Sequence, residues 1–362
     1  LHLADVAGDA WAGSGIVGML DIVLALEWLR DNIGAFGGDP GNVTIFGESG
    51  GGRKVSVLLG MPSAEGLFHR AIVQSSPGLR GREPAEASEV AEGLLTELGI
   101  GPNEVDKLQQ LPAERLLEAV TTLSARPSGG ARRGNPVMFL SPVVEGHHLP
   151  AHPFDPVAAP SAAAVPLLIG SNRDEMALFV AGDPRRRRLT EEELRQRLAP
   201  RLGDRVNDVI DVYKRTRPEA TPWDRYIGIL SEDRRLGCIQ LAERKLAGGP
   251  APVFMYLFAW ESDYKGYLFK AAHALEIPFV FDTVDEVPLT GDRPDKYGLA
   301  ANMSEAWIAF ARGADPNHPG IPRWAPYTLD NRATMILDVP CRVEVDPARE
   351  ELDAWEGIDV DP

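Results

Sequence analysis

Strand-like runs alternate with helical stretches along this chain, and the alternation limits the possible fold more than any other feature. β-branched and apolar runs of strand length occur at residues 42–46, 71–74, 165–170, 253–260, 334–337 and 342–345. Helical patterns fill 20–33, 55–59, 83–125, 190–248 and 300–311, and a further extended stretch is expected at 137–144. Strands that alternate with helices predict a mainly parallel sheet with helices on both faces.

We expect these elements to form a single domain over residues 1–362. Two helical blocks, at approximately 83–130 and 183–248, interrupt the strand-forming segments, so we interpret them as insertions that could roof a pocket. A loop rich in glycine, arginine, serine and proline is expected at 127–135.

The composition excludes several classes of function. Acidic side chains outnumber basic ones by 53 to 37, and the net charge of −16 disfavours nucleic acid as a partner. The basic run 185–188 precedes an acidic helix start, so we interpret it as a solvated loop. No apolar stretch reaches the roughly 20 residues that span a bilayer, so no membrane segment is expected.

Cys238 and Cys341 lie far apart, which suits a reducing compartment and favours the cytoplasm, with secretion left open.

One pentapeptide carries the strongest chemical signal. Gly47-Glu48-Ser49-Gly50-Gly51 matches the pattern G-x-S-x-G and lies between a predicted strand and a predicted helix. In this context the pattern indicates a sharp turn that exposes a nucleophilic serine at a helix N-terminus. We expect Gly47 and Gly51 to permit the tight turn, Ser49 to be the nucleophile, and the amide of Gly50 to bind the oxyanion.

An activated serine needs a histidine base, and with this turn the order along the chain is serine, acid, histidine. Only His273 and His318 come late enough, and His318 lies among turn-forming residues. His273 follows a predicted strand, so we predict that it is the base. The acid should follow an earlier strand, where Asp174 and Glu175 both qualify. Spacing alone leaves these two open, and one of them is expected to be solvated or to pair with a neighbour such as Arg173.

Three histidines, His147, His148 and His152, form a competing constellation that could bind a metal. Pro150 spoils helical spacing between the last two, and no nearby cysteine completes a ligand set, so we expect no metal. No phosphate-binding glycine loop occurs, so we expect no nucleotide cofactor.

At this point the residues resemble one family closely, the type-B carboxylesterases, which include bacterial para-nitrobenzyl esterases and the cholinesterases. The resemblance runs nearly end to end. It is most specific over residues 18–33 and 36–51, which look like the family's nucleophile signature. The presence of Gly50, where many members have alanine, should be tolerated because only its backbone N–H is needed.

The resemblance also implies roles for individual residues. Residues 170–175 resemble the family's acid loop, whose last residue is the triad acid, and this selects Glu175 over Asp174. The histidine loop of the family resembles the segment around His273 and supports that residue as the base. Ser75 corresponds to a serine that sits beside the triad.

From this resemblance we expect the α/β-hydrolase fold and a serine carboxylester hydrolase that acts on small esters through an acyl-enzyme intermediate, without a cofactor. The family carries strands and a Gly-Gly oxyanion loop upstream of the region that matches Leu1, and this sequence has neither. We therefore expect the complete protein to be an active esterase and these residues alone to be poorly active or unstable. The alternatives are a non-catalytic recognition module of the same fold, or a lipase, thioesterase or amidase. The sequence leaves the oligomeric state open.

Overall fold

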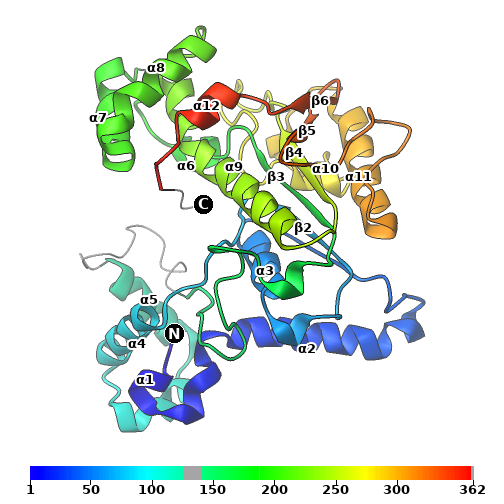
Figure 1. Cartoon of the computed structure of the whole chain (residues 1–362). Helices are drawn as coiled ribbons and strands as arrows, with labels where there is room; N and C mark the ends of the chain where they lie inside the picture. The colour runs from blue at the N-terminus through cyan, green and yellow to red at the C-terminus, as the bar shows by residue number, and fades with distance from the viewer. Residues whose placement is uncertain (126–139, 187, 360–362) are drawn as a thin grey trace. The chain divides into compact units, whose positions relative to one another are not determined.

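The structure, a computed structural model, describes residues 1–125, 140–186 and 188–359 (Figure 1). The helices are α1 Ala4–Ala7, α2 Val17–Asn32, α3 Gly50–Leu59, α4 Pro84–Leu98, α5 Ala113–Ala125, α6 Ala177–Val180, α7 Glu191–Leu202, α8 Val206–Thr216, α9 Pro222–Gly248, α10 Ile277–Val280, α11 Lys296–Gly313 and α12 Arg349–Asp353. The strands are β1 Thr44–Glu48, β2 Arg70–Gln74, β3 Leu167–Asn172, β4 Val253–Phe258, β5 Ala333–Leu337 and β6 Arg342–Val345.

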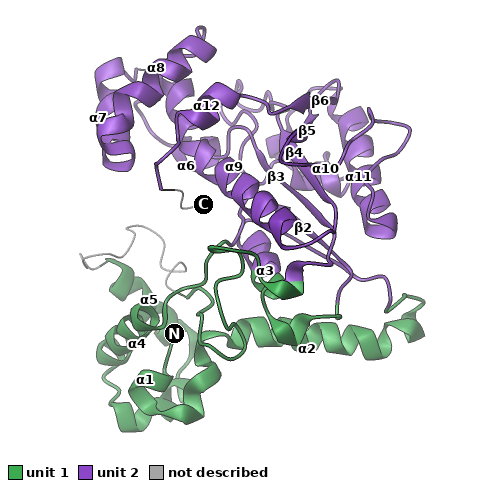
Figure 2. Cartoon of the chain, in the orientation of Figure 1, with its two compact units in different colours: residues 1–40, 57–67, 79–161 green, residues 41–56, 68–78, 162–362 purple. Residues whose placement is uncertain are grey.

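The chain divides into two compact units (Figure 2). The first comprises residues 1–40, 57–67 and 79–161 and includes α1, α2, α4 and α5. The second comprises residues 41–56, 68–78 and 162–362 and contains every strand of the sheet. The single domain over 1–362, with insertions at 83–130 and 183–248, stays a prediction.

The strands form one six-stranded sheet in the order β1-β2-β3-β4-β5-β6 within the described residues. Neighbours pair in parallel from β1 to β5, whereas β6 pairs antiparallel with β5. The predicted mainly parallel sheet is therefore confirmed. In the part of the chain that the structure describes, β1 pairs with β2 alone and so forms one edge of the sheet, and its Phe46 is about half exposed.

Most predicted elements agree with the structure within a few residues, but two expectations need comment. The extended stretch predicted at 137–144 forms no strand of the sheet over its described part, where Val143 makes an isolated parallel bridge with Arg82. The loop predicted at 127–135 lies outside the described residues.

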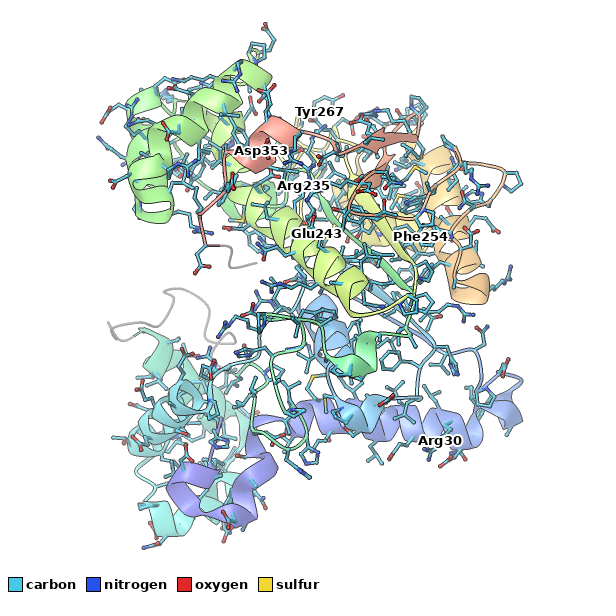
Figure 3. The ribbon with its side chains drawn as sticks, in the orientation of Figure 1. Arg30, Arg235, Glu243, Phe254, Tyr267 and Asp353 are labelled. Atoms are coloured by element: carbon cyan, nitrogen blue, oxygen red, sulfur yellow. The ribbon has the colours of Figure 1, made fainter. Side chains whose placement is uncertain are left out.

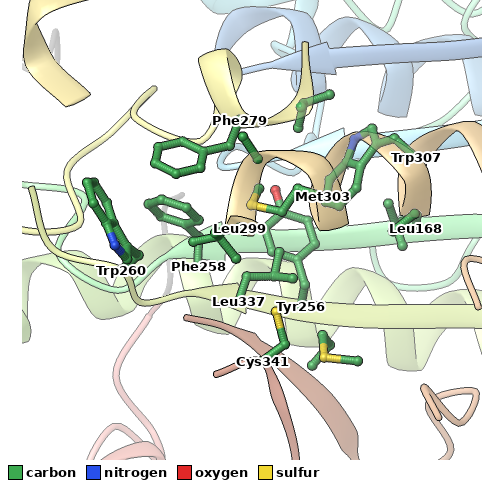
Figure 4. Close-up of a cluster of buried hydrophobic side chains, with 14 of the residues drawn as sticks. Leu168, Tyr256, Phe258, Trp260, Phe279, Leu299, Met303, Trp307, Leu337 and Cys341 are labelled. Carbon is green, nitrogen blue, oxygen red and sulfur yellow. The ribbon is translucent and has the colours of Figure 1, made fainter. Parts of the chain in front are cut away.

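Helices cover the sheet on both faces. Aromatic side chains of β4, among them Tyr256 and Phe258, pack with Phe279 of α10 and with Met303 and Trp307 of α11 in one buried cluster (Figure 4). α9 packs against β3 and β4 and contributes no residue to that cluster, so it covers the opposite face. A sheet buried on both faces places its chemistry at the strand ends.

Side chains of α9 also reach the C-terminal part of the second unit. Arg235 donates a hydrogen bond to the carbonyl of Pro347, and Glu243 pairs with Arg332 just before β5 (Figure 3 labels Arg235 and Glu243). These contacts fix α9 along the sheet.

No single helix among the described residues is long and apolar enough to cross a membrane. One pair, Asp9–Gly15 with Val17–Phe36, meets the length and composition criterion only when taken together, and it is bent by 77°.

Lys245 is a buried lysine of α9 whose ammonium has an unusual environment. Its side chain is fully buried, and Nζ donates to the carbonyl oxygen of Ala163 at 3.2 Å. Burial lowers the pKa of Lys245 to about 8, because the charged form is poorly solvated. At neutral pH the charge of Lys245 therefore destabilises the folded state.

We predict that Lys245→Met stabilises the protein at pH 7. The unfolded lysine keeps its ordinary pKa of 10.5, so the cost is fully present below about pH 8 and disappears as the pH rises towards 10.5. Allowing for the lost hydrogen bond, the free energy of unfolding should rise by about 1–2 kcal/mol. Urea unfolding at neutral and alkaline pH measures this, with the exposed Lys54→Met as control. A gain that is equal at both pH values, or absent at pH 7, would contradict the explanation.

Candidate active site

The turn between β1 and α3 is tight because backbone segments meet there. β1 ends at Glu48, α3 begins at Gly50, and Ser49 between them has a left-handed φ of 54°. The amide of Ser49 donates to the carbonyl of Gln74 at the end of β2, at 3.0 Å. A Cβ on Gly47 would lie 2.4 Å from the carbonyl carbon of Gly51. The turn therefore requires glycine at position 47 and holds Ser49 in a strained, half-buried position.

The structure contradicts the prediction that Gly51 is the second glycine required by this turn. A Cβ on Gly51 would meet nothing within 4 Å, so this residue is not what permits close approach. The neighbouring Gly52 is, because its Cβ would lie 2.9 Å from the carbonyl oxygens of both Gln74 and Ser76. The pentapeptide pattern ends one residue before this contact, so sequence analysis missed it.

We predict opposite effects of alanine at two glycines of the turn. Gly47→Ala forces backbone atoms apart and should lower the free energy of unfolding by about 2 kcal/mol or more. Gly51→Ala lies in the first turn of α3 with open space and should be neutral or stabilising by up to about 1 kcal/mol. Thermal unfolding of both variants measures this. Equal destabilisation by the two changes would mean that the turn does not depend on the contact at Gly47.

The predicted acid and base are in contact. Nδ1 of His273 donates to Oε2 of Glu175 at 2.5 Å, because an ionised carboxylate only accepts. The other oxygen, Oε1, accepts the backbone amide of Asn172 at 2.8 Å. Glu175 is fully buried and His273 is 5% exposed, so this pair lies away from water. Asp174 instead pairs with Arg173 at 3.0 Å, the arrangement that the sequence allowed for one of the two carboxylates.

Backbone hydrogen bonds join the loop that carries Glu175 to the loop that carries His273. The amide of His273 donates to the carbonyl of Glu175 at 3.3 Å, and the amide of Asp174 donates to the carbonyl of Ala271 at 3.0 Å. The side-chain amide of Asn172 donates to the carbonyl of Ala272 at 2.7 Å. The two side chains therefore meet because the backbone holds the loops in register.

The second ring nitrogen of His273 faces Glu48. Nε2 lies 3.2 Å from Oε1 of Glu48, the residue before Ser49. Within the described residues no hydrogen bond joins the Ser49 hydroxyl to His273. The aromatic ring of Phe179, from α6, lies against the imidazole at a centroid distance of 5.1 Å. The imidazole is thus held between two carboxylates and one aromatic face.

These contacts shift the ionisation of both groups. Burial lowers the pKa of His273, but the hydrogen bond and charge of Glu175, with the charge of Glu48, outweigh it, so the pKa lies above 6.5. Burial raises the pKa of Glu48, with the positive charge of His273 opposing and the charge of Glu175 adding to it. The site therefore favours an imidazolium more than an isolated histidine does.

Two further predicted residues lie close to the nucleophile. Gly50 is the first residue of α3, and amides of a first helical turn have no partner inside the helix, so its N–H is available to an anion. Ser75 directly follows Gln74, whose carbonyl receives the Ser49 amide. Its hydroxyl is buried and has no hydrogen-bond partner among the described residues, and its φ is 61°.

Sequence reasoning missed three polar residues of this site, namely Glu48, Asn172 and Glu276. The weak signals were that Glu48 precedes the nucleophile, that Asn172 ends β3, and that Glu276 follows the histidine by three residues. Such polar residues are common on protein surfaces, so only the fold could show that Asn172 and Glu276 are buried and that Glu48 faces the imidazole.

The competing histidines do not gather into a metal site. His147 and His148 contact each other at a ring-centroid distance of 4.5 Å, while His152 pairs with Glu83 at 3.0 Å. Among the described residues no group of three potential ligands surrounds a common point. His318 bonds to the carbonyl of Asn302 at 3.0 Å in its loop.

A serine on a sharp strand-to-helix turn, with a carboxylate and a histidine on later strand-end loops, is the arrangement of α/β-hydrolases. Comparison with known proteins narrows this class. The sequence model described as "Carboxylesterase family" matches residues 9–355. The para-nitrobenzyl esterase of Bacillus subtilis (strain 168) is 35% identical over 355 residues, which cover 97% of this chain and 69% of that protein.

Other relatives support the same family. The phenmedipham hydrolase of Pseudarthrobacter oxydans is 29% identical, and the match covers 94% of this chain and 68% of that protein. A crystal structure of a Geobacillus stearothermophilus carboxylesterase at pH 6.2 aligns with a TM-score of 0.81 and 39% identity, and covers 98% of this chain and 72% of that chain. The chain belongs to the carboxylesterase family, has the α/β-hydrolase fold, and is a serine hydrolase of esters.

Proposed function

We propose that the protein hydrolyses small carboxylic esters through an acyl-enzyme on Ser49, with His273 as base, Glu175 as acid and the amide of Gly50 as an oxyanion donor. The observation that carries this proposal is the buried 2.5 Å contact between His273 Nδ1 and Glu175 Oε2. That contact fixes the tautomer, so that Nε2 is the nitrogen left to take a proton.

The proposed reaction has two steps. In the first, Nε2 of His273 takes the proton of Ser49 as Oγ attacks the ester carbonyl, and the tetrahedral intermediate collapses when Nε2 returns that proton to the leaving alcohol. In the second, water attacks the acyl-enzyme by the same route and releases the acid. Before the first step, Nε2 and the Ser49 hydroxyl must come within hydrogen-bond reach of each other.

The names of the relatives support small esters as the substrate class. One is a para-nitrobenzyl esterase and another a phenmedipham hydrolase. The alternative functions are a non-catalytic recognition module of the same fold, which would lack activity, and a lipase, thioesterase or amidase, which would use the same triad. No observation on the described residues favours any of them.

We predict that Ser49→Ala abolishes ester hydrolysis. Removal of the attacking oxygen should lower kcat/KM for a short-chain nitrophenyl ester by about 10³-fold or more. Circular dichroism of the two proteins controls for folding. Hydrolysis that persists in the variant would contradict Ser49 as the nucleophile.

We predict that Glu48→Gln moves the acid limb of the pH–activity profile to lower pH. The base must be neutral, and the charge of Glu48 at 3.2 Å helps to keep His273 protonated. Without that charge the apparent pKa in kcat/KM should fall by about one unit. An unshifted limb would show that Glu48 does not act on the base.

A further inference from the structure

Arg234 is a positively charged side chain of α9 that the proposed mechanism does not use. It is half-buried, and within the described residues no carboxylate forms an ion pair with it. Its Nη1 donates to the sulfur of Met176 at 3.5 Å, and its buried Nε has no hydrogen-bond partner among the described residues. A thioether is a weak acceptor, so the guanidinium lacks the oxygen partners that usually satisfy a partly buried arginine.

Two other arginines of the same helix are neutralised inside the protein. Arg225 pairs with Glu191, and Arg235 pairs with Glu232 at 3.2 Å. Arg234 departs from this pattern. Its missing partner is therefore specific to its position and not a general property of the helix.

That position is beside the catalytic base. The Cζ atom of Arg234 lies 5.4 Å from the ring centroid of Phe179, and the same ring lies 5.1 Å from the imidazole of His273, centroid to centroid. The guanidinium is therefore no further from the imidazole than these two distances together. Phe179 is 55% exposed, so an apolar surface that solvent can reach joins the positive charge to the base.

The charge of Arg234 is felt at the triad. Burial and the charge of Arg234 lower the pKa of His273, while Glu175 and Glu48 raise it. The pKa of Glu48 is raised by burial, and the charges of His273 and Arg234 oppose that rise. The guanidinium thus acts on the groups around the reacting atoms without bonding to them.

One alternative role for this charge lies inside the protein, namely to offset the charge of Glu48. The two side chains form no hydrogen bond or ion pair with each other in the part of the chain that the structure describes, and Oε1 of Glu48 faces His273 at 3.2 Å instead. An internal role would therefore act only through space. It would influence every substrate alike, whereas a binding role would favour substrates of one charge.

We propose that Arg234 is a specificity-determining residue that binds a carboxylate of the substrate, so that this site takes half-esters of dicarboxylic acids. The inference rests on the proposed function. A guanidinium presents planar N–H groups that match the two oxygens of a carboxylate. The methylene chain between the carboxylate and the ester would lie on the exposed ring of Phe179.

The charge of the whole protein makes a local contact necessary for such a preference. With a net charge of −16, the protein repels an anionic ester at long range. A preference for the anion over a neutral ester of the same shape would therefore have to come from a side chain at the site.

The test compares two esters of matched shape. Monoethyl adipate carries a carboxylate at the end of its acyl chain, and the ethyl ester of adipic acid monoamide carries a neutral carboxamide in its place. In the unsubstituted protein the ratio of kcat/KM for the first ester to kcat/KM for the second should exceed one. Arg234→Met should lower this ratio by about tenfold or more, because it removes a charge-assisted hydrogen bond.

Two further variants control for charge and for folding. Arg234→Lys keeps the charge but loses the planar geometry, so the ratio should fall less than in Arg234→Met. Arg312→Met removes an exposed positive charge of α11 and should leave the ratio unchanged. If Arg234→Met does not fold by circular dichroism, Arg234→Gln removes the same charge and carries the test.

Binding supplies a readout that needs no turnover. The Kd of each ester is measured by NMR titration of the Ser49→Ala protein, which cannot form the acyl-enzyme. Monoethyl adipate should bind more tightly than the monoamide ester, and addition of Arg234→Met should raise its Kd by about tenfold.

A kcat/KM ratio at or below one in the unsubstituted protein overturns the proposal, as do equal Kd values for the two esters or binding of neither. A loss in Arg234→Met that is equal for both esters also overturns it, and would show that Arg234 only offsets Glu48. Failure of the proposed function is a separate result, because it would appear as hydrolysis of the neutral ester that survives in Ser49→Ala.

Discussion

The buried contact between Glu175 and His273 is the constraint on which the carboxyl end of the sheet depends. A charged carboxylate removed from water is stable only if both oxygens have partners, and here one oxygen binds the imidazole and the other the amide of Asn172. Those partners come from the last residue of β3 and from the loop that follows β4, so the parallel register of these strands decides whether the contact can form.

The second feature of this site is the negative charge that surrounds the imidazole of His273. Glu175 lies against one ring nitrogen and Glu48 against the other, while Glu276 is buried on the loop that carries His273. Three carboxylates cannot all ionise cheaply beside one cation, which is why burial and mutual repulsion raise the pKa values of Glu48 and Glu276. The same surroundings that stabilise an imidazolium during acyl transfer also hold the base protonated at low pH.

Much of this arrangement could be predicted from the sequence, because local patterns determined it. The comparisons confirm the family and the fold, and β5 and β6 lie within one residue of their predicted bounds. The positions of Glu48 and Glu276 could not be predicted, since they depend on neighbours that only the sheet register supplies. Gly52 was missed for the same reason, because its close contacts are the carbonyls of Gln74, which ends β2, and of Ser76, which follows that strand.

The most direct test of the central claim is to find which residue reacts. The protein is treated with a fluorophosphonate, which captures a serine activated by a histidine, and the modified peptide is identified by mass spectrometry. The account predicts a single adduct on Ser49, formed faster as the pH rises through the pKa of His273. A folded protein that remains unmodified, or an adduct on another residue, would contradict it.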